Sequence, residues 1–243
     1  METGLLDSAQ ISDDTLCRLM LERHPSTISI QKPAIALRKL KPIIKAALEL
    51  SNKGGFQAMS LRELSKKSGV SMGGMYAYFD SKQTLLNMIL SEVTSAVERL
   101  LSTPPEHIAD APIEHLNWFI DAHVRLTEGM LPWFVFAFME AKNFPKRERR
   151  MAIDSEILTE SYVFDICARA KAEGLFRQEI SELAPSLIKP LLQDWYVKRS
   201  KYARKGVSVD DYIDSVQDFV LNACLSAKGR EALAASRSNG VAL

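Results

Sequence analysis

The stretch Ser60–Phe79, with the sequence SLRELSKKSGVSMGGMYAYF, determines how the rest of the chain is interpreted. Ser60 and Glu63 have the spacing of a capping box, in which each side chain bonds the other residue's backbone N–H at the start of a helix. Gly69 then supplies a tight turn, and Ser71 can cap a second helix. The sequence therefore predicts two short helices joined by a three-residue turn, which is the pattern of a helix-turn-helix.

The two predicted helices cover residues 61–68 and 72–79, and their apolar residues are spaced so that they can share a core. These residues are Leu61, Leu64, Val70, Met75 and Phe79. A longer helix is expected before them, with Pro42 in its first turn and Gly54-Gly55 at its end. Its apolar face is formed by Leu40, Ile43, Ile44, Ala47 and Leu48. Three helices in this order make a compact head.

Basic residues are concentrated around this unit. The chain of 243 residues has 31 Lys and Arg against 30 Asp and Glu, so its net charge is only +1. Between Lys32 and Lys82, however, ten basic residues stand against three acidic ones. A solvated surface is one interpretation of this block. Together with the helix-turn-helix, it favours binding to DNA.

From Ala46 to Leu86 the sequence resembles the TetR family of one-component transcriptional regulators. The resemblance is carried by AALEL at 46–50, GF at 55–56, SLRELS at 60–65, SGVS at 68–71, MYAYF at 75–79 and SKQTLL at 81–86. It implies an all-α protein with an N-terminal three-helix DNA-binding head and a larger helical domain for ligand binding and dimerisation. We expect an extension over residues 1–31, the head over 32–84, and the effector and dimerisation domain over 85–243.

The resemblance also implies that residues 72–79 are the recognition helix in the major groove. Phosphate contacts are implied for Ser71, Tyr76, Tyr78 and Lys82. Contacts with base edges are implied for Met72, Gly73, Gly74, Tyr76 and Ala77. Hydroxyls, a lysine and a helix N-terminus are good phosphate partners, which agrees with these roles.

The predicted recognition helix carries no arginine or glutamine that could clamp a guanine or an adenine. Base specificity is therefore expected to come partly from residues before and beside it, together with the shape of the DNA. These residues are the arm Arg38, Lys39 and Lys41. Arg62 is another candidate for a phosphate or base contact, and Ser60 is also expected to bind DNA. Each glycine of the Gly73-Gly74 pair costs a helix about 1 kcal/mol relative to alanine. Close approach of the backbone to DNA would explain both.

The remainder of the chain is predicted to be helical. A helix over 81–101 leads to Pro104-Pro105, and others are expected at 112–128, 131–141, 146–173, 182–203 and 208–227. The tail from Ala227 is expected to be loose. The resemblance implies a homodimer through the helices near 182–203 and 208–227. A two-fold protein of this kind would bind a pseudo-palindromic operator in double-stranded DNA.

Aromatic residues are concentrated in the C-terminal part and predict a cavity for a small apolar or amphipathic effector. The candidate effector-binding residues are Trp118, Phe119, His123, Trp133, Phe134, Phe138, Tyr162, Phe164 and Trp195. An ordinary hydrophobic core is the alternative explanation for most of them. No cofactor and no metal site are predicted.

One competing class is a helical ligand-binding or hydrolytic protein whose helix-turn-helix no longer binds DNA. The run Gly69–Gly73 matches G-x-S-x-G, the nucleophile elbow of serine hydrolases, but that motif requires a preceding strand. The longest apolar run, Met130–Met139, is about half the ~20 residues that a membrane span needs. We therefore expect a cytoplasmic protein with no membrane partner and no catalytic residue.

Overall fold

The computed structural model describes residues 12–238, and within this range every regular element is a helix. The predicted all-α class is confirmed. Extended pairing among the described residues amounts to one isolated bridge, between Phe176 and Leu225. Over the same range, no helix is both long and apolar enough to cross a membrane.

The chain forms two compact units, and neither is continuous in sequence. The N-terminal unit contains the described residues up to Ala96, together with 129–155. Its helices are α1 (Asp13–Arg23), α2 (Pro33–Gly54), α3 (Leu61–Ser68), α4 (Met72–Met75), the first part of α5 (Lys82–Leu101), α8 (Leu131–Met139), the 3-10 helix η2 (Ala141–Asn143) and the start of α9 (Lys146–Ala172).

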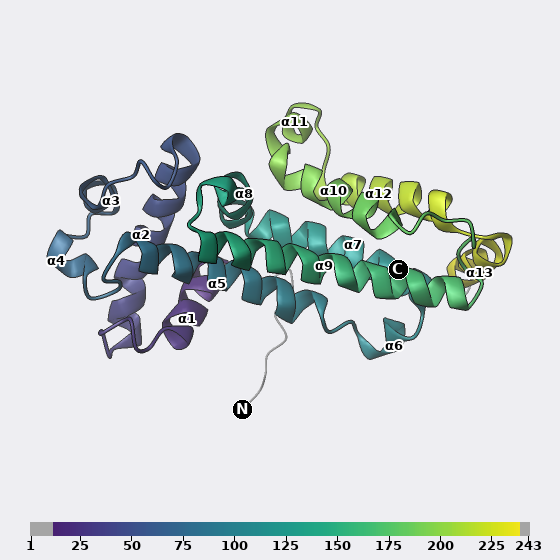
Figure 1. Ribbon diagram of the computed structural model, residues 1–243, viewed down its shortest axis with the longest axis horizontal. Helices are drawn as coiled ribbons and strands as arrows, with labels where there is room; N and C mark the ends of the chain where they lie inside the picture. The colour runs from purple at the N-terminus through teal and green to yellow at the C-terminus, as the bar shows by residue number, and fades with distance from the viewer. Residues whose placement is uncertain (1–11, 239–243) are drawn as a thin grey trace. The chain divides into compact units, whose positions relative to one another are not determined.

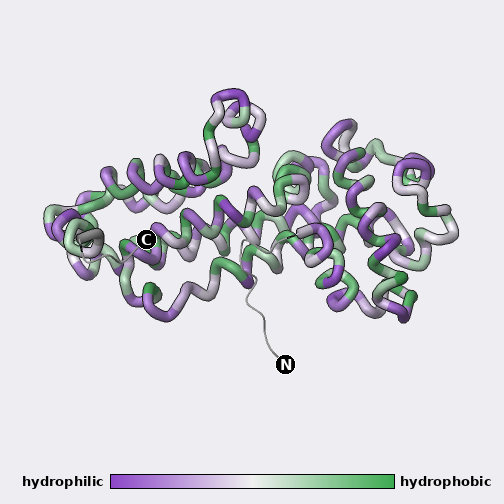
Figure 2. Tube along the Cα trace, turned by 180° about the vertical axis from the view of Figure 1, so that it is seen from behind, coloured by the Kyte–Doolittle hydropathy of each residue, from purple (hydrophilic) through white to green (hydrophobic). Residues whose placement is uncertain are grey.

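The C-terminal unit contains residues 97–128 and the described residues from Glu156 onward. Its helices are the end of α5, α6 (Glu106–Ala109), α7 (Pro112–Gly129), most of α9, α10 (Ala184–Val197), α11 (Arg199–Arg204), α12 (Val209–Cys224) and α13 (Ala227–Ser238). α10 and α12 run side by side (Figure 1). Hydrophobic and hydrophilic residues alternate along the helices at short intervals, as amphipathic helices require (Figure 2).

The first helix of the head begins earlier than its sequence predicts. α2 starts at Pro33, so Pro42 lies inside the helix and not in its first turn. The apolar face continues upstream through Ala36 and Leu37, which are buried. α1 packs against α2, so the buried side of α2 is longer than the head alone would require. Part of the 1–31 extension is therefore a structural element of the N-terminal unit.

Two later helices also differ from prediction. The helix expected over 182–203 is divided at Lys198, which separates α10 from α11. The tail from Ala227 was expected to be loose, and this is wrong, because residues 227–238 form α13. The start of α13 is fixed by tertiary contacts, including a hydrogen bond of 2.9 Å from the Ser226 N–H to the Leu175 carbonyl. A Cβ added at Gly229 would lie 2.1 Å from that carbonyl oxygen, so only glycine allows this approach.

Candidate nucleic-acid interface

Both serine caps of the predicted helix-turn-helix are present. The Ser60 Oγ accepts a hydrogen bond from the Glu63 N–H at 3.2 Å, and the Glu63 carboxylate accepts one from the Ser60 N–H at 2.8 Å. The hydrogen bonds from the Ser60 N–H and from the Ser60 hydroxyl to the Glu63 carboxylate lower the pKa of Glu63. The Ser71 Oγ accepts from the Gly74 N–H at 3.2 Å. Gly69 lies between the helices with φ of +70°, a conformation that favours glycine. The sequence pattern therefore folds locally as expected.

The recognition helix is shorter than predicted. α4 covers only residues 72–75, and a turn replaces the helix over the following residues. Within this turn the Tyr78 N–H bonds the Met75 carbonyl at 2.8 Å, an i to i+3 connection. Two consecutive glycines disfavour a longer regular helix. Four of the five expected core residues are buried, and Leu61 is half-buried.

The outer face of this unit carries several of the predicted DNA-contacting residues. Tyr76 has 55% of its surface exposed, although tyrosine is a large and partly apolar residue. The other exposed members of the predicted set are Arg38, Lys39, Ser60, Arg62, Ser71 and Gly73. Met72, Gly74 and Ala77 are half-buried. An exposed helix N-terminus beside hydroxyl and basic side chains is suited to bind phosphate.

Besides the two capping serines, three residues of the predicted set have structural partners. Tyr78 is fully buried, and its hydroxyl donates to the Ala36 carbonyl at 3.1 Å, so we leave it out of the proposed DNA contacts. Burial also raises its pKa. The Lys82 Nζ donates to the carbonyls of Gln57 and Met59 at 2.8 and 3.0 Å. Lys41 pairs with Asp14 of α1 at 2.8 Å.

Two residues that sequence reasoning did not identify hold the head in place. Glu140, which follows α8, is buried and accepts a hydrogen bond from the Phe56 N–H at 2.9 Å. It therefore fixes the turn between α2 and α3. The Ser29 N–H bonds the Ala77 carbonyl at 2.9 Å, so the segment before α2 lies against the end of the recognition unit. Neither contact has a local sequence signal, because its partners are 84 and 48 residues apart.

The hydrolase alternative conflicts with the geometry around Ser71. Its side chain caps α4, and it follows the turn after α3. No strand precedes it in the described part of the chain. A nucleophile elbow requires a strand-to-helix turn, so the G-x-S-x-G match has no matching structural context.

The candidate effector residues are divided between the two units. Trp133, Phe134 and Phe138 belong to the N-terminal unit, where the Trp133 indole N–H donates to Asp13 of α1 at 3.2 Å. Phe138 is 42% exposed. The remaining six lie in the C-terminal unit, so the nine residues do not form one cluster within either unit.

Within the C-terminal unit, three of these six residues lie together. The Phe119 ring centroid is 6.3 Å from those of both His123 and Tyr162. Trp195 belongs to a separate cluster, in which its ring centroid lies 5.5 Å from that of Tyr202 and its indole N–H donates to Glu128 at 2.9 Å. The other two members of the predicted set are Trp118 and the exposed Phe164.

His123 has an unusual partner in the core. Its Nε2 lies 3.0 Å from the Nζ of Lys189, and both side chains are buried. Burial lowers the pKa of Lys189 to about 8 and that of His123 well below its usual value. The Nδ1 atom of His123 has no hydrogen-bond partner among the described residues.

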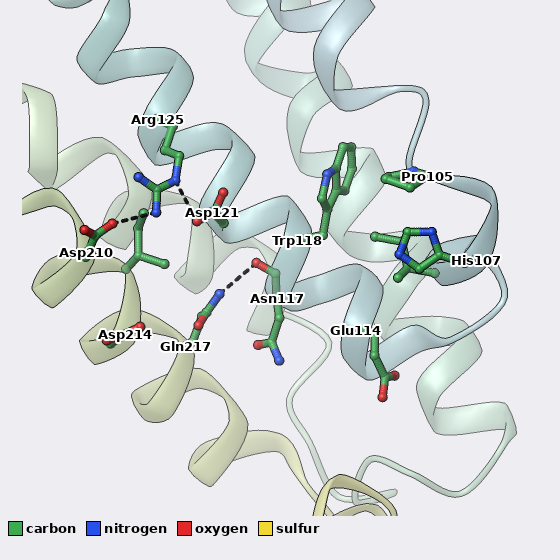
Figure 3. Close-up of a pocket in the computed structure, with 12 residues that line it drawn as sticks. Pro105, His107, Glu114, Asn117, Trp118, Asp121, Arg125, Asp210, Asp214 and Gln217 are labelled. Atoms are coloured by element: carbon green, nitrogen blue, oxygen red, sulfur yellow. Dashed lines mark hydrogen bonds and ion pairs between the residues drawn. The ribbon is translucent and has the colours of Figure 1, made fainter. Parts of the chain in front are cut away.

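A cavity of about 520 Å³ lies in the C-terminal unit, beside α6 and α7 on one side and α12 on the other (Figure 3). This is within the usual range for small-molecule sites. Trp118 is the only predicted effector residue that lines it. The other lining residues are Pro105, His107, Ile108, Glu114, Asn117, Asp121, Arg125, Asp210, Ile213, Asp214 and Gln217. The pairing of α7 with α12 could not be predicted from local pattern.

Residues 43–89 match the family profile described as bacterial regulatory proteins of the tetR family. The match covers the end of α2 and all of the helix-turn-helix. The chain therefore contains a helix-turn-helix segment of the TetR type. The regulator HbdR of Aromatoleum sp. (strain CIB) is 22% identical over 205 residues, which cover 84% of this chain and 89% of that relative.

Two further comparisons agree with this TetR-family assignment. The repressor KstR of Rhodococcus jostii (strain RHA1) is 31% identical over 104 residues, but the match covers 40% of this chain and about half (48%) of KstR. The crystal structure of PfmR from Thermus thermophilus superimposes with a TM-score of 0.60. It is 24% identical and covers 74% of this chain and 97% of PfmR, which supports the fold. Together with the match at residues 43–89, these relatives support a DNA-binding transcriptional regulator.

Proposed function

We propose that this protein is a ligand-responsive repressor that binds a pseudo-palindromic operator as a homodimer. The observation that carries the proposal is the exposed outer face of α4 and its two capping residues. There Ser71, Gly73 and Tyr76 are open to solvent next to a strongly basic segment. The naming of KstR as a repressor supports the direction of control.

Readout of the operator would depend on few side chains. Tyr76 and Met72 would contact thymine methyl groups, while Gly73 would let the backbone approach the groove. Arg38, Lys39 and Arg62 would contact phosphates or base edges beside the groove. Such an interface depends strongly on counterion release and on the shape of the DNA.

Exposed apolar side chains on α10 and α12 support the proposed dimer. Leu183, just before α10, and Leu187 within it are each 64% exposed. Phe219 on α12 is also 64% exposed. Burial of such exposed apolar side chains against a second copy of the chain removes them from water and would stabilise a dimer. A two-fold arrangement would pair these helices with the same helices of the partner, and two recognition units would face two half-sites.

Ligand response would follow from a cavity in the C-terminal unit. An effector shifts an equilibrium between DNA-binding and non-binding states only if it binds the two states unequally. α5 contributes its first part to the N-terminal unit and its end to the C-terminal unit. This continuous helix is the proposed route by which effector binding would alter the spacing of the two heads.

The test is selection of random duplex DNA with the full-length protein, followed by sequencing at two salt concentrations. An enriched palindrome is expected, with affinity that falls steeply as salt rises. Tyr76→Ala should weaken operator binding at least tenfold. Lys39→Ala should weaken operator binding and should also make the operator affinity depend less steeply on salt concentration. Lys205→Ala, which removes an exposed base of the C-terminal unit, is the matched control. Recovery of no enriched sequence would overturn the proposal.

A further inference from the structure

The cavity beside α6, α7 and α12 has a strongly unbalanced charge. Four carboxylates line it, against a single guanidinium. The carboxylates are those of Glu114, Asp121, Asp210 and Asp214. An electrostatic field of this sign raises the local concentration of cations and excludes anions.

The single guanidinium does not neutralise all four carboxylates. The Nε of Arg125 pairs with Asp121 at 2.8 Å, and its Nη2 pairs with Asp210 at 2.6 Å (Figure 3). These two ion pairs occupy the carboxylates of Asp121 and Asp210. Glu114 and Asp214 form no ion pair within residues 12–238. The cavity therefore keeps two carboxylates available to a ligand.

A second, independent observation concerns Asn117. This side chain is only 3% exposed, and in Figure 3 it points into the space between α7 and α12. Its Oδ1 atom accepts no hydrogen bond from the described residues. A buried acceptor that lacks a donor destabilises the site, and a ligand that supplies the donor removes this cost. The complementary ligand group is a hydrogen-bond donor.

Most of the remaining wall of the cavity is apolar, and His107 and Gln217 are its polar members. The apolar part is formed by Pro105, Ile108, Trp118 and Ile213, and the indole of Trp118 is half-buried beside Pro105 (Figure 3). An indole face attracts cations as well as apolar groups. A cavity of about 520 Å³ with such a wall is suited to an organic molecule rather than to a bare metal ion.

We propose that this cavity binds an organic ammonium ion, namely a primary or secondary amine with an apolar body. Its N–H groups would donate to Asn117 and to the carboxylates of Glu114 and Asp214, and its body would lie against Trp118. The inference rests on the proposed function in one respect, because the amine is assigned as the effector. It specifies the small apolar or amphipathic effector expected from the sequence as a cationic one.

The position of the cavity is compatible with the proposed dimer. Asp210, Asp214 and Gln217 follow one another at intervals of four and three residues, so they share one face of α12. Phe219 follows Asp214 by five residues, and therefore points away from that face. A partner helix covering Phe219 would leave the cavity free for its ligand.

Binding is tested by titration calorimetry on the full-length protein with butylammonium, cyclohexylmethylammonium and 2-phenylethylammonium. Each amine is paired with the alcohol of the same carbon skeleton, and benzyltrimethylammonium tests the need for an N–H donor. At least one amine should bind tenfold or more tightly than its alcohol, and the quaternary ion should bind more weakly. If no amine binds better than its alcohol, the proposal is overturned.

Matched variants locate the binding site. Asp214→Asn and Glu114→Gln should each weaken amine binding by roughly tenfold, the size expected for losing one nearby charge. Asp218→Asn on the same helix removes the same charge outside the cavity, and should leave the affinity unchanged. Equal affinities for the wild type and for the first two variants would place the amine elsewhere and refute the proposal.

A final comparison separates the amine site from the proposed function. The operator affinity of the wild type and of Asp214→Asn is measured with and without the amine. Release of the operator from the wild type alone would support both the site and its role as the effector site. Amine binding that depends on Asp214 but leaves the operator affinity unchanged would confirm the site and refute ligand response through it.

Discussion

Replacing Gly73 with alanine tests whether glycine is required at this position by the folded protein or by contact with DNA. A Cβ built at Gly73 has no protein atom within 4 Å, and its φ lies outside the left-handed region. Gly74 differs, because a Cβ there would lie 3.1 Å from the Ser71 Oγ and 3.2 Å from the Val70 Cγ1. Nothing within the described chain therefore requires glycine at position 73.

The expected effects on stability and on binding have opposite signs. Alanine stabilises a helix by about 0.5–1 kcal/mol relative to glycine when its conformation is permitted. For a chain of this size, that corresponds to a rise in Tm of about 2 °C. If the backbone at Gly73 contacts the groove, the added methyl group should weaken operator binding tenfold or more, about 1.4 kcal/mol. Gly74→Ala should gain less stability than Gly73→Ala, because it crowds the Ser71 cap.

The assay combines thermal unfolding with operator titration for the wild type and both alanine variants. The expected result for Gly73→Ala is an unchanged or raised Tm together with weakened operator binding. Operator affinity equal to that of the wild type would refute the argument that Gly73 is kept for close approach to DNA. A lowered Tm would refute the argument that the fold does not require this glycine.

Three further predictions concern stability. Glu140→Ala should lower the free energy of unfolding by about 1–3 kcal/mol, because the Phe56 N–H loses its acceptor. Glu140→Gln keeps an acceptor oxygen and should lower the free energy of unfolding by less. Equal losses for the two variants in urea unfolding would contradict this. Burial lowers the pKa of Lys189 to about 8, below its unfolded value of 10.5, so the unfolded chain binds more protons between these values. Stability should rise with pH across this window in the wild type relative to Lys189→Met, and parallel curves would count against it. Arg23→Met should destabilise the N-terminal unit by more than about 1 kcal/mol, since Arg23 bonds the buried Glu92 at 2.8 Å. Adding Glu92→Gln should recover part of the loss, and strictly additive losses in a double-mutant cycle would argue against this pairing.

The contrast between Tyr76 and Tyr78 shows a limit of sequence reasoning at the candidate interface. Both tyrosines lie in one motif and were expected to contact DNA. The structure exposes Tyr76 and buries Tyr78 against the Ala36 carbonyl of α2. The shortened α4 and the turn that follows it decide this difference. Two adjacent glycines suggested strain but not where the helix would end.

The amino-acid sequence by itself determined the helical class, the two serine caps and the glycine turn of the helix-turn-helix. These features depend on hydrogen bonds and backbone preferences within about four residues, which a local pattern records. Only the tertiary structure decided that the aromatic residues divide between two units, and that α7 and α12 enclose a cavity lined by carboxylates. The ion pair between Arg125 and Asp210 joins residues 85 positions apart. Such pairs form only when helices pack, so their chemistry depends on which faces meet in the folded chain.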